Sequence, residues 1–585
     1  MLRYLPRYRG ALGLGLTTLV LGQLLQAFAP QLLKRALSAL DRTATGFDAT
    51  VARSIAVRFA LLYVGTTLAQ GLLAYLTRRR LVGLSRQFER DLKRDVFGRL
   101  VSLPLSFFDR MRTGDLLSRL TSDVEAVRFS VGPGVMYLAQ TAVKLPAALV
   151  AMAFMDLKLT LLLLAPLAAI AAVVRLISPS ILARSRAVQD RLGDLSTKAQ
   201  ESFAGARVVR AYATEDRERD EFRAKNLSLL AQTLGLARSR ALMSGALRLV
   251  GDLALLFVVW LGGRQIMGKS LDVPTLIAFL FYLDMLLWPM ISLGYVLASF
   301  QRASAAMARL DEVCLHPAEP ETVGAPAPSL PARLLGALST RGLTFAYPGA
   351  TRPALKDVSI DLPAGSTLAL VGPVGSGKST LAALLSRLYD VPAGTVLLDG
   401  IDVNAVPLPR LRAAFAFVPQ DGFLFSETLR ANLSYGARAA PSPERVTAAA
   451  HDAGLEDDLA ILPHGLDTVV GERGVTLSGG QRQRATLARA LLSDAPVLVL
   501  DDALSAVDTR TEARILDRLR EARRGRTAVI VAHRLSTIRD ADDIVVLDQG
   551  RVVERGTHDR LAAAGGWYAR TWRLQRLSAE VEELV

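Results

Sequence analysis

The sequence predicts a membrane protein in two parts: an all-α six-helix transmembrane domain with long cytosolic helical extensions, followed by an α/β domain with a largely parallel sheet. Three observations support this fold class. Long apolar stretches are confined to the N-terminal half, and the whole basic excess also lies there, since residues 1–320 carry a net charge of +16 and the rest of the chain −1. Short β-rich runs then alternate with helical patterns. With 51% apolar residues, a disordered polar chain is excluded.

The membrane domain is predicted from stretches of roughly 20 apolar residues, the length that crosses a bilayer core about 30 Å thick. Six such stretches lie near residues 11–33, 55–77, 130–154, 158–178, 242–263 and 272–297. The first could instead be a signal peptide, since Arg3, Arg7 and Arg9 precede an apolar run that ends in Ala27-Phe28-Ala29. Pro30 directly after that cleavage-like sequence favours a span, as does an even number of spans, which keeps both termini on the cytosolic side.

Two longer connections, 78–129 and 179–241, are rich in Arg, Asp and Glu yet keep apolar residues at helical spacing. They are predicted to be helices that continue out of the bilayer. Arg78-Arg79-Arg80 places that end of the second span on the cytosolic side. We therefore expect a multi-pass protein of the plasma (inner) membrane, in contact with membrane lipid, with both termini cytoplasmic. Its one cysteine, Cys314, excludes a disulfide framework within the chain.

Some polar residues fall at membrane depth, where charged groups usually pair or face a watery cavity. They are Gln140 and Lys144 in the third span, Arg248 and Asp252 in the fifth, and Asp284 in the sixth. Arg248 and Asp252 stand four residues apart and are predicted to satisfy each other. Lys144 and Asp284 have no partner in their own spans. They either pair across the helix bundle or line a substrate path, and their opposite charges select neither cations nor anions.

The domain boundaries are predicted from a change in composition. Residues 316–333 contain five prolines and no apolar period, which is typical of a surface linker. The predicted organisation is a transmembrane domain over 1–315, a linker over 316–335 and a second domain over 336–585. The β-rich runs of the second domain are 366–371, 497–500, 528–531 and 544–547.

The first of these runs leads into a glycine-rich loop typical of an α/β P-loop NTPase. Its predicted nucleotide-binding residues are Gly372, Gly375, Ser376, Gly377, Lys378, Ser379 and Thr380. Glycines let backbone N–H groups cradle phosphate oxygens at a helix N-terminus, Lys378 neutralises phosphates, and the Ser379 hydroxyl can ligate Mg²⁺. Asp501 ends the apolar run 497–500 and is suited to hold the Mg²⁺ shell. The alternative is a glycine-rich strand-to-helix turn without a ligand.

Further motifs make a family recognisable. Leu477-Ser478-Gly479-Gly480-Gln481 resembles the signature motif of ATP-binding-cassette (ABC) transporters. In order along the chain, Tyr347 resembles the aromatic that stacks on adenine, Gln420 the Q-loop residue, Ser505-Ala506-Val507-Asp508 the D-loop, and His533 the switch histidine. Phe107-Phe108-Asp109 and the segment 114–120 resemble the first cytosolic loop of ABC exporters of the six-span half-transporter type. The resemblance to this family covers nearly the whole chain.

The resemblance implies ATP and Mg²⁺ as cofactors. It implies Asp502, His533 and Gln420 as catalytic residues, Ser379, Gln420 and Asp501 as metal ligands, and Ser478, Gly479, Gly480 and Gln481 as contacts to ATP held by the opposite subunit. Such an exporter moves a solute, here unknown and expected to be hydrophobic or amphipathic. No nucleic-acid partner is expected, because the sequence shows neither a nucleic-acid recognition motif nor a basic patch interleaved with aromatic residues. An ATP-gated channel or regulator is the alternative from another functional class.

Asp502 departs from the family pattern, because competent sites usually carry Glu there. A carboxylate one methylene shorter falls about an ångström short, and a misplacement of 1 Å can cost on the order of 10²-fold in rate. Paired exporters often combine one Asp-bearing chain that has an intact signature with a Glu-bearing chain that has a degraded one. The expected partner is therefore a second ABC half-transporter in a heterodimer. A homodimer with slow hydrolysis is the alternative.

Overall fold

The computed structural model describes residues 5–41, 48–323, 330–471, 474, 477–505, 509–522 and 525–584. The chain divides into two compact units. The first unit comprises Met1–Val101 and Thr113–His316, and the second comprises Ser102–Arg112 and Pro317–Val585. The second unit is therefore built from two separate stretches of the chain. The predicted limits 1–315, 316–335 and 336–585 stay predictions.

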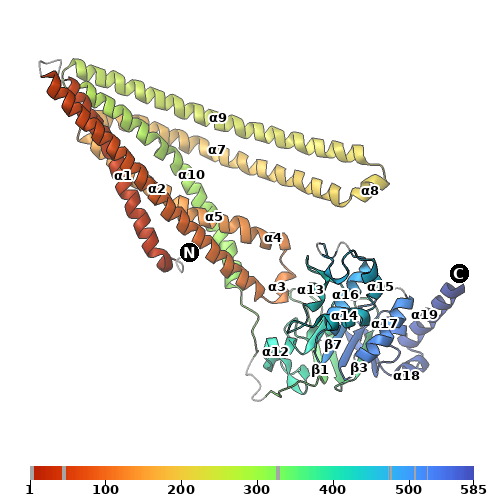
Figure 1. Ribbon diagram of the computed structural model, residues 1–585. Helices are drawn as coiled ribbons and strands as arrows, with labels where there is room; N and C mark the ends of the chain where they lie inside the picture. The colour runs from red at the N-terminus through yellow and green to blue at the C-terminus, as the bar shows by residue number, and fades with distance from the viewer. Residues whose placement is uncertain are drawn as a thin grey trace. The chain divides into compact units, whose positions relative to one another are not determined.

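The first unit is helical (Figure 1). Its helices are α1 (Leu5–Asp41), α2 (Ala49–Val101), α4 (Thr113–Ser118), α5 (Val124–Phe129), α6 (Val135–Ala153), α7 (Leu157–Ala204), α8 (Ala206–Ala211), α9 (Glu215–Met267) and α10 (Val273–Leu315). Two π-helical turns, η2 (Arg119–Asp123) and η3 (Ser130–Gly134), join α4, α5 and α6. Five described stretches are long and apolar enough to cross a membrane: Pro6–Leu40, Thr50–Val101, Thr113–Ala153, Leu157–Ala204 and Glu215–Met267. The sixth predicted span falls on α10, whose apolar part Val273–Leu286 is shorter.

The long helices extend well beyond a bilayer. At about 1.5 Å per residue, the 53 residues of α9 measure roughly 80 Å, against about 30 Å of bilayer core. Figure 1 shows α7 and α9 running side by side to the short helix α8. Lys198 on α7 lies 2.9 Å from Glu218 and 2.6 Å from Glu221 on α9, and its hydrogen bond lowers the pKa of Glu221. The predicted helical extensions are confirmed.

The charged residues at membrane depth do not pair as expected. Arg248 and Asp252 both lie on α9, yet no ion pair within 4 Å joins them among the described residues. The sequence prediction of a local pair is not met, because four-residue spacing brings two side chains near without fixing their rotamers. Lys144 on α6 and Asp284 on α10 also form no ion pair at that distance within the described part of the chain.

The second unit is an α/β fold with two sheets. The antiparallel sheet has the order β2-β1-β4-β5, made of β1 (Leu338–Phe345), β2 (Leu355–Leu362), β4 (Val396–Leu398) and β5 (Ile401–Asp402). The larger sheet has the order β10-β9-β3-β8-β7-β6, made of β3 (Thr367–Val371), β6 (Phe415–Val418), β7 (Val497–Asp501), β8 (Thr527–Val531), β9 (Asp543–Asp548) and β10 (Arg551–Gly556). All its pairs are parallel except β9 with β10. The predicted largely parallel sheet is confirmed.

Helices cover this sheet on both faces, which is why β3, β7 and β8 are buried along their whole length and read as continuous apolar runs. The described helices of the whole second unit are α3 (Leu105–Phe108), α11 (Lys378–Leu385), α12 (Leu408–Arg412), α13 (Leu429–Ser434), α14 (Pro443–Asp452), α15 (Glu456–Ile461), α16 (Gly479–Leu491), α17 (Thr509–Ala522), α18 (His558–Ala563) and α19 (Trp567–Leu584). Short 3-10 turns are η4 (Val403–Ala405), η5 (Gly465–Asp467) and η7 (Leu535–Ile538). Because β3, β6, β7 and β8 are parallel, their carboxyl ends share one edge of the sheet.

The segment Ser102–Arg112 is part of the second unit although it is far from the rest in sequence. Phe107 on α3 is buried. The Tyr389 hydroxyl donates to the Asp109 carboxylate at 2.8 Å, and burial together with this hydrogen bond raises the pKa of Tyr389. The backbone N–H of Glu319 donates to the Ser102 carbonyl at 2.9 Å. The family-like motif Phe107-Phe108-Asp109 thus has defined partners in this unit.

The start of the predicted linker also packs on the second unit. The fully buried guanidinium of Arg387 donates to the backbone carbonyls of Pro320 at 2.7 Å and Glu321 at 3.3 Å. The N–H of Leu408 also donates to the Glu321 carbonyl, at 2.9 Å. Part of the stretch predicted as linker is therefore ordered by hydrogen bonds to α12 and to the end of α11.

Candidate nucleotide-binding site

The glycine-rich loop between β3 and α11 needs its glycines for close backbone approach. Gly372 has a φ of +142°, and a Cβ there would lie 2.0 Å from the Leu547 carbonyl oxygen. Gly377 has a φ of +102°, and its Cβ would lie 2.8 Å from the Ala354 carbonyl oxygen. Gly375 also has a positive φ, +78°, but faces open space. The loop can therefore take this path only if residues 372 and 377 carry no side chain.

Lys378 begins α11 with a buried ammonium group, 5% exposed. Its Nζ donates to the carbonyls of Gly372 at 2.9 Å and Pro373 at 2.8 Å, so the loop closes around the charge. Burial lowers the pKa of Lys378, while the carboxylates of Asp501 and Asp502 act in the opposite direction. The ammonium also donates to the Ser376 hydroxyl at 3.5 Å, so its hydrogen-bond acceptors are neutral oxygens. Such a buried cation is a receptor for an anion, because a phosphate oxygen offers a stronger acceptor than a carbonyl.

Ser379 and Asp501 bring two oxygen ligands together. The Ser379 hydroxyl donates to the Asp501 carboxylate at 2.8 Å, and Asp501 is 5% exposed at the end of β7. Burial raises the pKa of Asp501, against the hydrogen bond from Ser379 and the charges of Lys378 and His533. Hydroxyl and carboxylate oxygens are the ligands that Mg²⁺ prefers. The residues present therefore fit a magnesium ion shared with phosphate oxygens.

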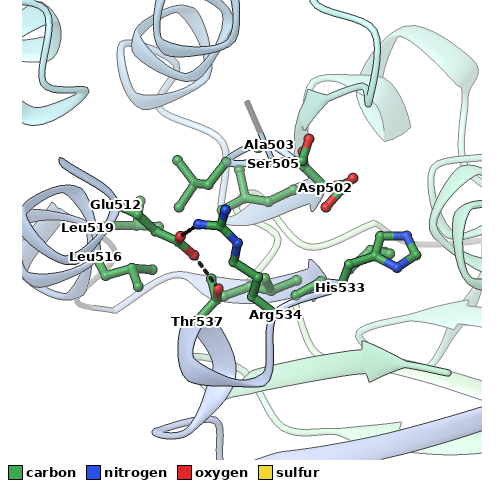
Figure 2. A pocket seen from close by; sticks show the side chains of 14 residues that line it. Asp502, Ala503, Ser505, Glu512, Leu516, Leu519, His533, Arg534 and Thr537 are labelled. Atoms are coloured by element: carbon green, nitrogen blue, oxygen red, sulfur yellow. Dashed lines mark hydrogen bonds and ion pairs between the residues drawn. The ribbon is translucent and has the colours of Figure 1, made fainter. Parts of the chain in front are cut away.

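Three more predicted residues lie at the same sheet edge. Gln420 is exposed just after β6, Asp502 directly follows β7, and His533 is exposed just after β8. Asp502 has a φ of +50°, and its backbone N–H donates to the Val531 carbonyl at 3.0 Å. The carboxylate therefore projects from a backbone fixed to β8. Figure 2 shows Asp502 and His533 lining one cavity.

Tyr347 lies beside the loop helix in an aromatic cluster. Its hydroxyl is 3.0 Å from the Thr380 hydroxyl, and its ring meets Phe345 and Tyr389 edge to face with centroids 5.1 and 5.2 Å apart. The cluster holds the half-buried Tyr347 ring next to α11. Its predicted role in stacking on adenine stays a prediction.

The signature-like segment forms the start of α16. The Ser478 hydroxyl accepts the N–H of Gln481 at 3.2 Å, while the Gln481 side chain accepts the N–H of Ser478 at 2.8 Å, which makes a capping box. The Gln481 amide also donates to Asp458 at 3.0 Å. Ser478 and Gly479 are exposed, and Gly480 is partly exposed. Of the D-loop segment, only Ser505 belongs to the described residues.

Sequence reasoning missed a buried carboxylate, Glu512, on the wall of the cavity that Asp502 and His533 also line. Glu512 on α17 is 4% exposed, and Arg534 and Thr537 donate to its two carboxylate oxygens (Figure 2). The three line the same cavity of about 170 Å³. The signal was available: Glu512 shares helical spacing with the apolar residues Ile515 and Leu519, and a carboxylate on the apolar face of a helix predicts a buried partner.

We expect the Glu512→Ala substitution to destabilise the second unit by about 1–3 kcal/mol, because it removes a buried carboxylate that accepts hydrogen bonds from Thr537 and from the exposed Arg534. Thermal unfolding of the purified protein measures this as a lower Tm. Glu521→Ala on the same helix removes an exposed carboxylate and is the matched control. Equal Tm values for the two variants would contradict a stabilising role for Glu512.

We expect Lys378→Ala to reduce ATP binding at this site by about tenfold or more, because a charge-assisted contact to phosphate contributes about 1.5–3 kcal/mol. Photo-crosslinking with an azido-ATP measures the labelling of this chain. Lys356→Ala removes a lysine on β2, outside the loop, and should leave labelling unchanged. Undiminished labelling of the Lys378 variant would refute the site assignment.

Comparisons with known proteins agree with this architecture. Residues 12–290 match the family described as "ABC transporter transmembrane region", and residues 355–505 match "ABC transporter". The chain is 34% identical to a probable multidrug resistance ABC transporter ATP-binding/permease protein of Bacillus subtilis, over 94% of this chain and 93% of that protein. It is 34% identical to an ATP-dependent lipid A-core flippase of Photobacterium profundum, covering 98% and 96%. A solved bacterial Atm1-family ABC exporter with ATP bound has a TM-score of 0.79, 32% identity and 98% coverage of both chains.

Proposed function

Because this chain belongs to the ABC transporter family and is a multi-pass membrane ATPase coupled to transport, we propose that it is one half of a heterodimeric exporter. It exports a hydrophobic or amphipathic solute by alternating access across the plasma (inner) membrane. Its second unit and both termini are cytoplasmic. The observation that carries the heterodimer is the combination of Asp502 with a fully formed capping box at Ser478.

ATP binding in this proposal uses the loop and its lysine. Loop N–H groups and the Lys378 ammonium bind phosphate oxygens, and the ammonium exchanges its carbonyl partners for the ligand. Ser379, Asp501 and Gln420 would hold Mg²⁺, which would supply positive charge to neutralise the phosphates. Tyr347 stacks on the base. His533 contacts the terminal phosphate from the end of β8.

Hydrolysis at this site is slow because the Asp502 side chain is too short to position the attacking water well. The backbone of Asp502 is tied to Val531, so the side chain alone must span the distance to the attacking water. Aspartate is one methylene shorter than the glutamate of competent sites. Misplacement by 1 Å costs on the order of 10²-fold, which supports a site that binds ATP and turns it over slowly.

ABC exporters function as dimers. In the proposed pair the exposed helix start at Ser478, Gly479 and Gly480 points its N–H groups at ATP bound by the partner subunit. This chain thus supplies an intact signature to the partner's competent site. Binding of ATP between the subunits shifts the pair from open to closed, and the long helices transmit that change to the spans.

The second candidate is a homodimeric lipid or drug exporter with slow hydrolysis. The names of the relatives favour it, since they include a lipid A-core flippase and a probable multidrug transporter. In a homodimer both sites would carry Asp502, and each would be completed by an intact signature.

Affinity purification of the tagged chain from its own membrane decides between the two. A heterodimer is expected to retain a second half-transporter with Glu at the catalytic position and a degraded signature. The control is co-expression of tagged and untagged copies of this chain. Recovery of the untagged copy, with no second half-transporter, would overturn the heterodimer.

A further inference from the structure

The loop that follows β8 carries His533 and is held by side chains from two helices. On one side, Arg534 and Thr537 donate to Glu512 on α17. Figure 2 shows the His533 ring directed away from this network. On the other side, the Gln575 amide on α19 contacts the backbone of the loop itself. The path of the loop therefore depends on α19 as well as on α17.

Both ends of the Gln575 amide are used. Its nitrogen, Nε2, donates to the His533 carbonyl at 2.9 Å, and its oxygen, Oε1, accepts the Leu535 backbone N–H at 2.8 Å. Because a donor faces an acceptor at each end, only one orientation of the amide satisfies both groups. One side chain thereby ties together the backbone immediately before and after Arg534.

The backbone of this loop needs a partner from outside it. Leu535 begins the 3-10 turn η7, and the first N–H groups of a helix have no acceptor within the helix. The Arg534 side chain at the N-cap position forms no capping hydrogen bond. Leu535 is fully buried, where an unpaired backbone N–H is costly. Gln575 thus supplies, from another helix, the cap that the local sequence lacks.

The face of α19 that carries Gln575 is anchored to the second unit. Tyr568, Trp572 and Gln575 follow one another at spacings of four and three residues, so they share one face of the helix. Tyr568 is fully buried, its N–H donates to the Glu554 carboxylate at 3.2 Å, and its hydroxyl lies 2.8 Å from His558 Nδ1. The Trp572 ring meets His558 edge to face, with centroids 4.7 Å apart. The Gln575 amide therefore projects from a fixed support.

The position of the His533 ring depends on the backbone that Gln575 holds. His533 is exposed, and within the described part of the chain its ring nitrogens form no hydrogen bond. Its side chain is short, so a shift of the backbone at residue 533 carries over to the ring. The residue lines the same cavity as Asp502. A change at α19 would therefore move a group at the edge of the candidate nucleotide site.

We propose that Gln575 is a positioning residue for the switch histidine. Its amide fixes the backbone on both sides of Arg534, so the His533 ring stays directed at the terminal phosphate of ATP bound in this site. The inference rests on the proposed function, which gives His533 that phosphate contact. Because ADP lacks the terminal phosphate, α19 joins the elements by which this chain distinguishes ATP from ADP.

The first test measures the preference of this chain for ATP over ADP. The assembled transporter is labelled on ice with a low concentration of azido-ATP and Mg²⁺, and unlabelled ATP or ADP competes for labelling of this chain. Gln575→Leu removes both hydrogen bonds and keeps a side chain of similar size and good helix propensity. The half-inhibiting ATP concentration should rise about tenfold, the effect of losing one hydrogen bond to a charged group. The half-inhibiting ADP concentration should stay within about twofold.

Ser578→Leu is the matched control, since it places leucine at an exposed polar position on the same helix. It should leave both half-inhibiting concentrations unchanged. An equal rise for ATP and ADP in Gln575→Leu would mean that the amide only stabilises the second unit, and this result would overturn the proposal. No change in either concentration would also contradict it.

A second variant keeps the inference testable if leucine prevents folding. Gln575→Glu retains an acceptor for the Leu535 N–H, but it places an oxygen without a proton opposite the His533 carbonyl. The same selective loss of ATP binding is expected. If neither variant folds while Ser578→Leu does, the role of Gln575 is structural and the positioning role is refuted.

Double substitution shows whether Gln575 acts through His533. Adding Gln575→Leu to His533→Ala should raise the half-inhibiting ATP concentration no further, because the group that Gln575 positions is already absent. A further rise as large as that of Gln575→Leu alone would show that Gln575 acts independently, and the inference would fail.

The inference and the proposed function fail in different ways. Loss of the ATP preference in His533→Ala, with no loss in Gln575→Leu, would refute the inference and leave the proposed function intact. An unchanged ATP preference in His533→Ala would instead refute the phosphate contact that the proposed function assigns to His533.

Discussion

Replacing Ser478 with arginine is expected to lower the steady-state ATPase of the assembled transporter by about 10²-fold. Ser478 caps α16, and its exposed hydroxyl stands at the helix start that completes the partner's ATP site in the proposed dimer. Arginine removes the cap and places bulk where phosphate must approach. Loss of one preorganised donor to developing negative charge costs on the order of 10²–10³ in rate. Ser478→Thr keeps the capping oxygen and should stay near the unmodified rate.

A substitution at Asp502 is expected to have a much smaller effect on ATPase activity than one at Ser478. Asp502→Gln should change the ATPase of the complex by less than about twofold, because the partner's site carries turnover in the proposed heterodimer. Both variants should still be labelled by azido-ATP through Lys378. Assaying the two purified complexes side by side gives the order of severity. Near-total loss of activity in Asp502→Gln would mean that this chain hydrolyses ATP itself, which favours the homodimer.

Gly372→Ala is expected to abolish ATP binding and to destabilise the second unit by at least about 3 kcal/mol. Its Cβ would lie 2.0 Å from the Leu547 carbonyl oxygen on β9, a backbone atom that cannot swing aside. Strand β9 pairs with β3, so the clash displaces two neighbouring strands of the sheet. Thermal unfolding and azido-ATP labelling measure the two effects.

Gly375→Ala is the matched control for this clash. Gly375 also has a positive φ, +78°, but its Cβ would meet open space. Only the backbone penalty applies there, about 1–2 kcal/mol. A Gly372→Ala variant no less stable than Gly375→Ala would contradict the close approach of Leu547.

The parts that the sequence predicted well are those encoded by local patterns. The apolar stretches predicted long helices because a bilayer demands a set length, and the runs 497–500 and 528–531 predicted strands because both faces of a parallel sheet are buried. The structure does bring Gly372 and Lys378 together in one loop, as their spacing predicts, and their binding of phosphate stays a prediction. The resemblance placed Asp502 and His533 in one site, and the structure puts both on the wall of one cavity.

The parts that it could not predict depend on long-range contacts. Glu512 and Arg534 are 22 residues apart, and only the packing of α17 against the end of β8 brings them together. Arg78 and Lys144 meet one cavity from different helices, which no spacing rule reveals. For Arg248 and Asp252, spacing alone was used to predict a pair, and the rotamers of the two side chains do not form it. Sequence patterns predict which residues share one face of a helix, whereas tertiary packing decides which residues of other elements contact that face.

The hydrogen bonds that Ser102–Arg112 and residues 317–323 form within the second unit have a consequence for isolating that unit as a fragment. A fragment of residues 336–585 alone would lack the backbone carbonyls of Pro320 and Glu321 that accept from the buried Arg387. It would also leave Tyr389 without Asp109. The second unit is therefore discontinuous in sequence, and its shorter piece lies in the chain between α2 and α4 of the first unit. A fragment that begins at residue 336 is therefore expected to be less stable than one that also carries these segments.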